Sequence, residues 1–247
     1  MITSEQNEWF RTWFDSPYYS LLYKNRSEEE AAAFTETLDR FLNLPDRSRV
    51  LDLACGKGRH SIYLRQHGYR VVGIDLSANS ISYAKQFEDA DLHFLRDDMR
   101  SFDLPYQFEA IFNLFTSFGY FDHLEDNSTV LKNVNKHLLP NGRFILDYFN
   151  AEKVKSCLKP FERKEEDGVV FEIRKAIENE KIVKTIDISS GQKSMTFQEK
   201  VQLIGPNDFR AMLAENGFEI LSTFGDYSLA PFDVTQSDRF IVIAAKK

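Results

Sequence analysis

Residues 50–61 read Val50-Leu51-Asp52-Leu53-Ala54-Cys55-Gly56-Lys57-Gly58-Arg59-His60-Ser61, an apolar run followed by two glycines one residue apart. The run predicts a buried strand, and residues 61–67 predict a helix that Gly68 ends. Glycine lets the backbone turn sharply and approach a ligand closely. The start of a helix also presents free N–H groups to an anion. We therefore predict a ligand-binding loop here, although a plain tight turn would use the same glycines.

Outward from this loop, short apolar runs alternate with helical patterns. The runs predict strands at residues 70–74, 92–95, 108–114, 143–149, 218–224 and 239–245. Helices are expected after Ser77, at residues 129–138 and after Pro206. Strands buried on both faces and separated by helices are typical of a parallel sheet with helices on both sides. We predict an α/β fold, a doubly wound, seven-stranded, mostly parallel sheet with a small antiparallel β insert.

Four segments follow from these patterns. Residues 1–48 are expected to form an N-terminal helical cap, in which Ser27 and Glu30 make a capping box. Residues 49–150 form the α/β core, 151–204 the β insert, and 205–247 the closing helix and last two strands. The insert has alternating strands at residues 169–177, 181–188 and 194–203. We expect its apolar row to pack on the core while its rim shapes a substrate pocket; the row comprises Phe171, Ile173, Met195, Phe197 and Val201.

Two acids narrow the choice of ligand. Asp52 lies four residues before Gly56, and Asp75 ends the second strand, seventeen residues after Gly58. An acid at that strand end can accept both hydroxyls of a ribose. The dinucleotide fingerprint requires a third glycine where Ser61 stands and has no place for Asp52. An NAD-dependent oxidoreductase is therefore the less favoured alternative.

In these residues the chain resembles the class I (Rossmann-like) S-adenosylmethionine-dependent methyltransferases of the small-molecule type. Residues 52–58 are similar to their acidic-x-x-x-Gly-x-Gly motif, and residues 71–77 to their second-strand motif. Residues 96–99 resemble the segment after the third strand, and 139–144 the loop entering the fifth. His60 replaces the third glycine of the commonest variant. The resemblance implies the seven-stranded class I methyltransferase fold, with S-adenosyl-L-methionine as cofactor and S-adenosyl-L-homocysteine as product.

The resemblance also implies roles for single residues. The two glycines would meet the methionine part, and Asp52 would orient it through its ammonium or through water. Asp75 would bind the ribose, and Asp98 with the Met99 N–H would bind the adenine. The aromatic stretch 9–23 is expected to be a lid over the cofactor or, alternatively, a helix packed on the sheet edge. The expected cofactor-binding residues are Tyr19, Tyr23, Arg26, Asp52, Ala54, Gly56, Gly58, Arg59, Asp75, Leu76, Asp98, Met99, Asn113, Leu114 and Phe115.

The catalytic residues are not determined by these patterns. A general base is optional for an amine that arrives neutral and more useful for a hydroxyl. Candidates are His60, Tyr120 and Tyr148, with His123 the weakest. The loop at residues 116–121 is expected to bound the substrate pocket. It lacks the two prolines usual in enzymes that methylate exocyclic base amines or glutamine amides.

Composition limits the partners. The chain has 247 residues, 43% hydrophobic and 28% charged, with a net charge of −7. An acidic chain argues against nucleic-acid binding, and two cysteines cannot form a four-cysteine metal site. With no long apolar run and no signal-peptide pattern at the start, we expect a cytoplasmic protein with a small-molecule substrate, no membrane contact and no metal. A homodimer is the candidate assembly. A non-catalytic, S-adenosylmethionine-binding regulatory protein is a further alternative.

Overall fold

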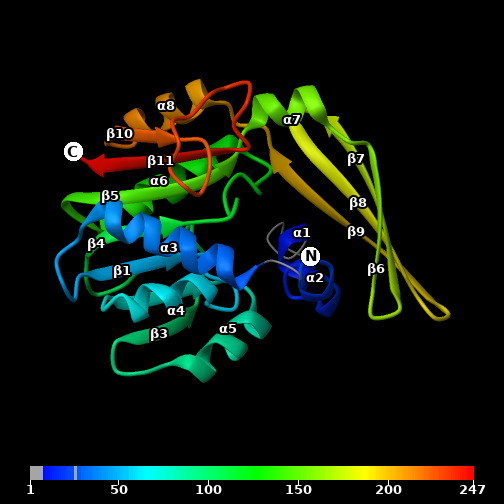
Figure 1. The fold of residues 1–247 in the computed structure, drawn as a ribbon, viewed down its shortest axis with the longest axis horizontal. Helices are drawn as coiled ribbons and strands as arrows, with labels where there is room; N and C mark the ends of the chain where they lie inside the picture. The colour runs from blue at the N-terminus through cyan, green and yellow to red at the C-terminus, as the bar shows by residue number, and fades with distance from the viewer. Residues whose placement is uncertain (1–7, 25–26) are drawn as a thin grey trace, which may run out of the picture. The chain divides into compact units, whose positions relative to one another are not determined.

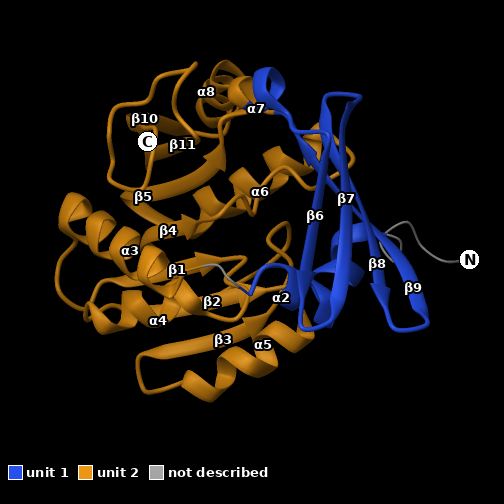
Figure 2. Cartoon of the chain, turned by 45° about the vertical axis from the view of Figure 1, so that its right-hand side comes forward, with its two compact units in different colours: residues 1–26, 154–203 blue, residues 27–153, 204–247 orange. Residues whose placement is uncertain are grey.

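The computed structural model describes residues 8–24 and 27–247, which form two compact units (Figure 2). The larger unit contains residues 27–153 and 204–247, and the smaller contains residues 154–203 with the described part of 1–26. The helix at Glu28–Leu42, expected in the N-terminal cap, belongs to the larger unit. In the described part of the chain, no helix combines the length and the apolar composition needed to cross a membrane.

The larger unit is built on a seven-stranded sheet in the order β10-β11-β5-β4-β1-β2-β3. All neighbouring strands are parallel except β11, which is antiparallel to both β5 and β10. This confirms the predicted doubly wound, mostly parallel sheet. The strands are β1 (Arg49–Leu53), β2 (Arg70–Asp75), β3 (Leu92–Arg96), β4 (Phe108–Asn113), β5 (Leu138–Phe149), β10 (Phe218–Phe224) and β11 (Arg239–Lys246).

Helices cover both faces of this sheet (Figure 1). Apolar residues of α3, α4 and α5 share one core cluster with β1, β2 and β4, while Phe209 of α8 packs on Tyr148 and Phe240 from the other face. Ser27 and Ser77 cap α3 and α5, each accepting a backbone N–H three residues on, as the sequence predicts. The helices are α3 (Glu28–Leu42), α4 (Arg59–Gln66), α5 (Ala78–Ala84), the 3₁₀ helix η2 (Lys85–Phe87), α6 (Leu124–His137) and α8 (Pro206–Glu215).

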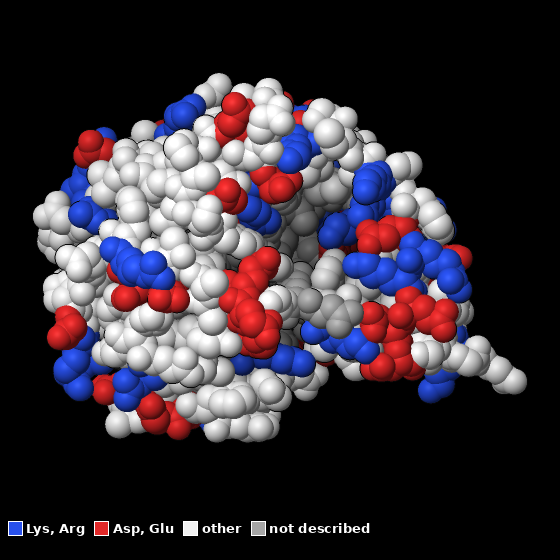
Figure 3. Space-filling view, viewed as in Figure 1, with Lys and Arg blue, Asp and Glu red and all other residues white. Residues whose placement is uncertain are grey.

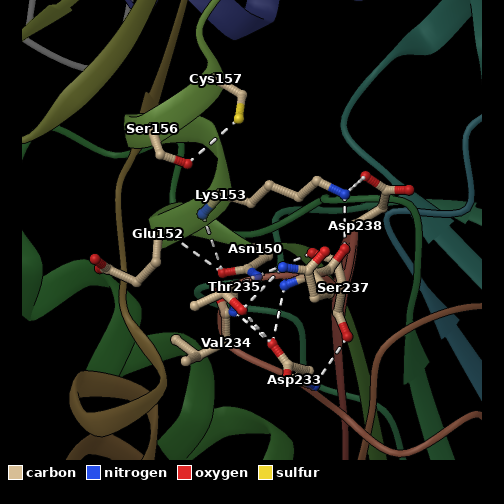
Figure 4. Close-up of polar contacts among 11 residues, drawn as sticks. Asn150, Glu152, Lys153, Ser156, Cys157, Asp233, Val234, Thr235, Ser237 and Asp238 are labelled. Atoms are coloured by element: carbon tan, nitrogen blue, oxygen red, sulfur yellow. Dashed lines mark hydrogen bonds and ion pairs between the residues drawn. The ribbon is translucent and has the colours of Figure 1, made fainter.

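Helix α7 (Ala151–Cys157) follows the sheet and was not predicted. Its start is fixed by Asn150, whose side-chain oxygen accepts the N–H of Glu152 at 3.1 Å. The same side chain donates to the carbonyls of Val234 (2.8 Å) and Ser237 (2.9 Å), which ties the loop before β11 to the end of β5 (Figure 4). A helix of seven residues is too short to show a recognisable helical periodicity in the sequence.

The smaller unit contains a four-stranded antiparallel sheet in the order β6-β7-β8-β9, one strand more than predicted. Strand β6 escaped prediction because Phe161–Glu166 is mostly charged and pairs only along one edge. The elements are α1 (Trp9–Trp13), α2 (Pro17–Leu22), β6 (Phe161–Glu166), β7 (Val169–Glu178), β8 (Lys181–Ser190) and β9 (Lys193–Gln202).

The insert's apolar row has a partner within the smaller unit that was not predicted. Phe171 and Ile173 share a buried cluster with Trp13 and Leu22 of the N-terminal helices. The physical reason is that residues 9–23 are rich in aromatic side chains, which bury large apolar areas. Glu199 of β9 supports this contact by accepting from the indole of Trp13 at 2.7 Å.

Candidate functional site

The loop after β1 leaves the sheet through three left-handed residues. Ala54, Gly56 and Gly58 have φ values of 63°, 56° and 82°. The loop is tied to β2 because the N–H of Cys55 donates to the carbonyl of Ile74 at 3.0 Å. A non-glycine residue in this conformation is strained, and such strain is concentrated at functional sites.

The two glycines face different surroundings. Apart from Gly56 and its two chain neighbours, no atom of the described residues lies within 4 Å of the position that a Cβ on Gly56 would occupy. A Cβ on Gly58 would lie 2.5 Å from the ring of Phe94, which is fully buried in β3. Gly56 is therefore the residue whose backbone is open to a ligand. Gly58 needs to be glycine because Phe94 fills the space beside it.

Asp75 joins this loop to the second strand. One carboxylate oxygen accepts the N–H of Gly56 and the other accepts the N–H of Ser77, both at 2.8 Å. A carboxylate accepts through both of its oxygens, and an acid at this strand end is the expected acceptor for the ribose hydroxyls. Asp75, the residue expected to bind the ribose, thus also fixes the conformation of the glycine loop.

Asp52 lies under the loop, in β1, and is only 2% exposed. The hydroxyl of Ser61 donates to its carboxylate at 2.6 Å. Burial raises the pKa of Asp52 to about 6, partly opposed by the bond from Ser61. Arg59, the first residue of α4, donates to the carbonyl of Ser27 at 3.1 Å and lies 5.3 Å from the ring centre of Phe115.

The segment after β3 carries a contact that the sequence analysis missed. Arg100 holds both carboxylate oxygens of Asp98, with side-chain distances of 3.0 and 2.7 Å. Asn133 donates to the carbonyl of Met99 at 3.4 Å, and the side chain of Arg96 donates to the carbonyl of Leu76, after β2, at 3.1 Å. The backbone N–H of Arg100 also donates to Asp98, at 2.9 Å, and the adenine role of Asp98 stays a prediction.

At the end of β4, Asn113 bridges to the neighbouring strand. Its side-chain nitrogen donates to the carbonyl of Leu53 at 2.9 Å, whereas its buried oxygen has no hydrogen-bond partner within residues 8–24 and 27–247. Leu114 follows and is buried. Phe115 and Thr116 are then both left-handed, with φ values of 63° and 61°. Thr116 begins the loop at residues 116–121 that is expected to bound the substrate pocket, and Phe115 is an expected cofactor-binding residue.

Two of the candidate bases are buried, one is hydrogen-bonded within its own loop, and one is exposed. His60 is buried, with Nδ1 3.4 Å from the hydroxyl of Thr35, and burial lowers the pKa of its imidazole to about 3. Tyr148 is fully buried, and burial raises its pKa well above the ordinary value. Tyr120 donates to the carbonyl of Thr116, and His123 is exposed at the start of α6. Their part in catalysis stays a prediction.

Two of the predicted cofactor residues belong to the smaller unit. The phenol of Tyr23 donates to Glu199 at 2.9 Å, and the ring of Tyr19 lies 5.1 Å from that of Tyr23. Arg26 lies outside the described residues. A cofactor role for these three residues stays a prediction.

The hydrogen-bond acceptors of the larger unit fit S-adenosylmethionine. The carboxyl ends of β1, β2, β3 and β4 meet at one edge of the sheet, and bring together the open backbone at Gly56 and the carboxylates of Asp75 and Asp98. The buried oxygen of Asn113 adds an acceptor without a partner in the described part of the chain. Acceptors for hydroxyl, amino and ammonium groups are what this cofactor requires.

Comparison with known proteins gives the same assignment. A family model described as "Methyltransferase domain" matches residues 24–223, most of the chain. The chain belongs to the class I S-adenosylmethionine-dependent methyltransferases. The cofactor of this family is S-adenosylmethionine.

Relatives of known activity include a Streptomyces venezuelae dTDP-3-amino-3,4,6-trideoxy-alpha-D-glucopyranose N,N-dimethyltransferase, 31% identical over 131 residues, or 52% of this chain and 54% of that protein. The cypemycin N-terminal methyltransferase of a Streptomyces species is 25% identical over 80% of this chain and 83% of its own. This chain spans about half the length of several curated relatives, including the first.

A solved structure has the same fold. It is an amino pentose methyltransferase of calicheamicin biosynthesis from Micromonospora echinaspora, with S-adenosylmethionine bound. The TM-score is 0.70 at 19% identity, over 94% of this chain and 98% of that one.

Gly56 and Gly68 offer a matched test of the methyltransferase loop. Gly56→Ala should weaken S-adenosylhomocysteine binding tenfold or more, because the added methyl group projects into open space that the cofactor approaches. The free energy of unfolding should fall by only about 1–2 kcal/mol, the cost of a left-handed alanine. Gly68 also has a positive φ (92°) and no described atom within 4 Å of a Cβ, so Gly68→Ala should cost the same stability and leave binding intact. Calorimetry and thermal unfolding measure both; equal affinities in the two variants would place the cofactor elsewhere.

Proposed function

We propose that this methyltransferase transfers the methyl group of S-adenosylmethionine to an amine nitrogen of a small molecule. The observation that carries the proposal is the open backbone of Gly56 held by Asp75, in a chain whose family uses this cofactor. Two relatives support a nitrogen acceptor, since one is named as an N,N-dimethyltransferase of a dTDP-linked amino sugar and the other as the cypemycin N-terminal methyltransferase.

The chemistry asks little acid–base work of the protein. Bound S-adenosylmethionine supplies a methyl group activated by a positively charged sulfur. The chain's own residues must hold the acceptor in line and exclude water, which is worth ~7–11 kcal/mol in well-oriented reactions. An amine that arrives neutral needs no general base. The packed surroundings of His60 and Tyr148 fit an enzyme that works by positioning.

The charge distribution favours a small acceptor over a nucleic acid. The net charge is −7, and on the face drawn in Figure 3 basic and acidic side chains of the described residues are interspersed. A nucleic-acid surface would need clustered lysines and arginines. This intermixing supports a small-molecule substrate. The cytoplasmic location and a homodimer stay predictions.

Binding and turnover test the proposal in sequence. We expect micromolar binding of S-adenosylmethionine and S-adenosylhomocysteine in calorimetry, about 8 kcal/mol, and none of NAD. A panel of amino sugars, their nucleotide-linked forms and short peptides, with matched hydroxyl compounds, is then screened by mass spectrometry for added methyl groups. Methylation of amines alone supports the proposal. Methylation of hydroxyls alone contradicts the nitrogen acceptor, and cofactor binding without any turnover favours a regulatory protein. Binding of NAD alone would overturn the cofactor assignment.

A further inference from the structure

A buried ion pair lies beside the candidate site and was not among the predicted residues. Asp147 of β5 is fully buried, and the side chain of Arg239, the first residue of β11, is 18% exposed. Arg239 Nε and one terminal nitrogen approach the same oxygen of Asp147, at 2.8 and 2.7 Å. In the antiparallel register, Arg239 pairs with Phe149 and Ile241 with Asp147, so the two charged side chains emerge from the same face of the sheet.

The second carboxylate oxygen of Asp147 turns toward the loop after β4. It accepts the N–H of Phe115 at 2.8 Å and the phenol of Tyr227 at 3.3 Å. The carbonyl of Asp147 accepts the N–H of Thr116 at 2.9 Å. Arg239 completes the arrangement by donating to the hydroxyl of Thr116 at 2.9 Å. Both members of the ion pair therefore bond directly to the loop.

This loop needs such support. Phe115 and Thr116 are consecutive non-glycine residues with positive φ, a conformation that side chains disfavour unless the surroundings impose it. Phe115 also lies near two guanidinium groups, those of Arg59 at 5.3 Å and Arg239 at 5.9 Å. Hydrogen bonds to ionised groups are stronger than neutral ones, so a charged pair suits a strained segment.

We infer that Asp147 and Arg239 are positioning residues, which hold residues 114–121 in the strained conformation that places the methyl acceptor. The inference rests on the proposed function, because it concerns the loop expected to bound the substrate. It adds two residues that act through Phe115 and Thr116.

Thr116 gives the sharpest test, because its side-chain hydroxyl accepts the hydrogen bond from Arg239 and can be removed by a single substitution. Thr116→Val removes the hydroxyl, whereas Thr116→Ser keeps it. We expect Thr116→Val to speed amide hydrogen exchange in peptides covering residues 114–121 about tenfold, and to lower kcat for the acceptor about tenfold. The affinity for S-adenosylhomocysteine should change less than threefold. Thr116→Ser should restore both the protection and kcat.

Further variants separate positioning from a general loss of structure. Thr129→Val, on the exposed face of α6, is the matched control and should change neither measurement. Asp147→Asn and Arg239→Lys should increase exchange in the same peptides beyond Thr116→Val, with exchange elsewhere in the sheet unchanged. Unchanged protection of residues 114–121 in Thr116→Val would overturn the inference, as would equal losses in Thr116→Val and Thr116→Ser. If the wild type binds S-adenosylhomocysteine but methylates no acceptor, the proposed function fails, while the exchange data still decide whether the pair holds the loop.

Discussion

Replacing Asp75 with alanine should weaken S-adenosylhomocysteine binding at least about 100-fold. The carboxylate accepts the N–H of Gly56, and it is the proposed acceptor for both ribose hydroxyls. Hydrogen bonds to a charged group contribute about 1.5–3 kcal/mol each, so losing two exceeds the roughly 2.8 kcal/mol that a 100-fold change requires. The loop loses its anchor in the same variant. Calorimetric titration of the purified protein measures the effect.

Two further variants show whether the loss belongs to the cofactor. Asp75→Asn keeps one acceptor oxygen and the size of the side chain, so its binding should fall between wild type and Asp75→Ala. Asp89 offers the control, since its carboxylate accepts the N–H of Asp91 at 2.7 Å before β3, at the opposite end of that strand from the glycine loop. Asp89→Ala should leave binding unchanged. Wild-type affinity in Asp75→Ala would refute the ribose assignment.

Gly58→Ala should destabilise the protein strongly, by about 3 kcal/mol. The left-handed backbone costs an alanine about 1–2 kcal/mol, and forcing a methyl group against a packed ring costs about 1–3 kcal/mol more. The clash is with Phe94 at 2.5 Å and with Ala84 at 3.3 Å. For a chain of this size, the midpoint of thermal unfolding should fall by about 6–12 °C.

A double-mutant cycle isolates the clash. Phe94→Leu shortens the side chain beside Gly58, so Gly58→Ala should cost less in that background than in the wild type. Gly68→Ala gives the left-handed cost without a neighbour. Equal costs for Gly58→Ala in both backgrounds would mean that Phe94 is not the reason for glycine at this position.

Residues near one another in the sequence explain most of what was predicted correctly. The strands of the larger sheet contain mostly apolar, buried runs, and Asp75 follows the second run directly. Ser27 and Ser77 act within one helical turn. The early start of β5 at Leu138 instead of 143 was missed, because Pro140, Asn141 and Gly142 read as a loop. In the structure Leu138 is buried and pairs with Phe108.

Contacts between distant residues explain what was missed. An aspartate inside the apolar run of residues 144–149 was the available signal for Asp147, because a charge in a doubly buried strand requires a partner. Nothing in the sequence selected Arg239, 92 residues away, from the other cations. Arg100 and Asp98 are only two residues apart in the sequence, but a short run of charged residues in a turn predicts a solvated surface rather than a specific ion pair.

The sequence by itself determined the fold class, the glycine loop and the acid at the end of β2, because hydrophobic periodicity and backbone preferences act within a few residues. Only the tertiary structure decided that Gly56 is open while Gly58 packs on Phe94, that Asp147 and Arg239 hold the loop after β4, and that the β insert packs with the N-terminal helices. These outcomes depend on which of many chemically equivalent side chains meet once the sheet is assembled, and no local pattern encodes that choice.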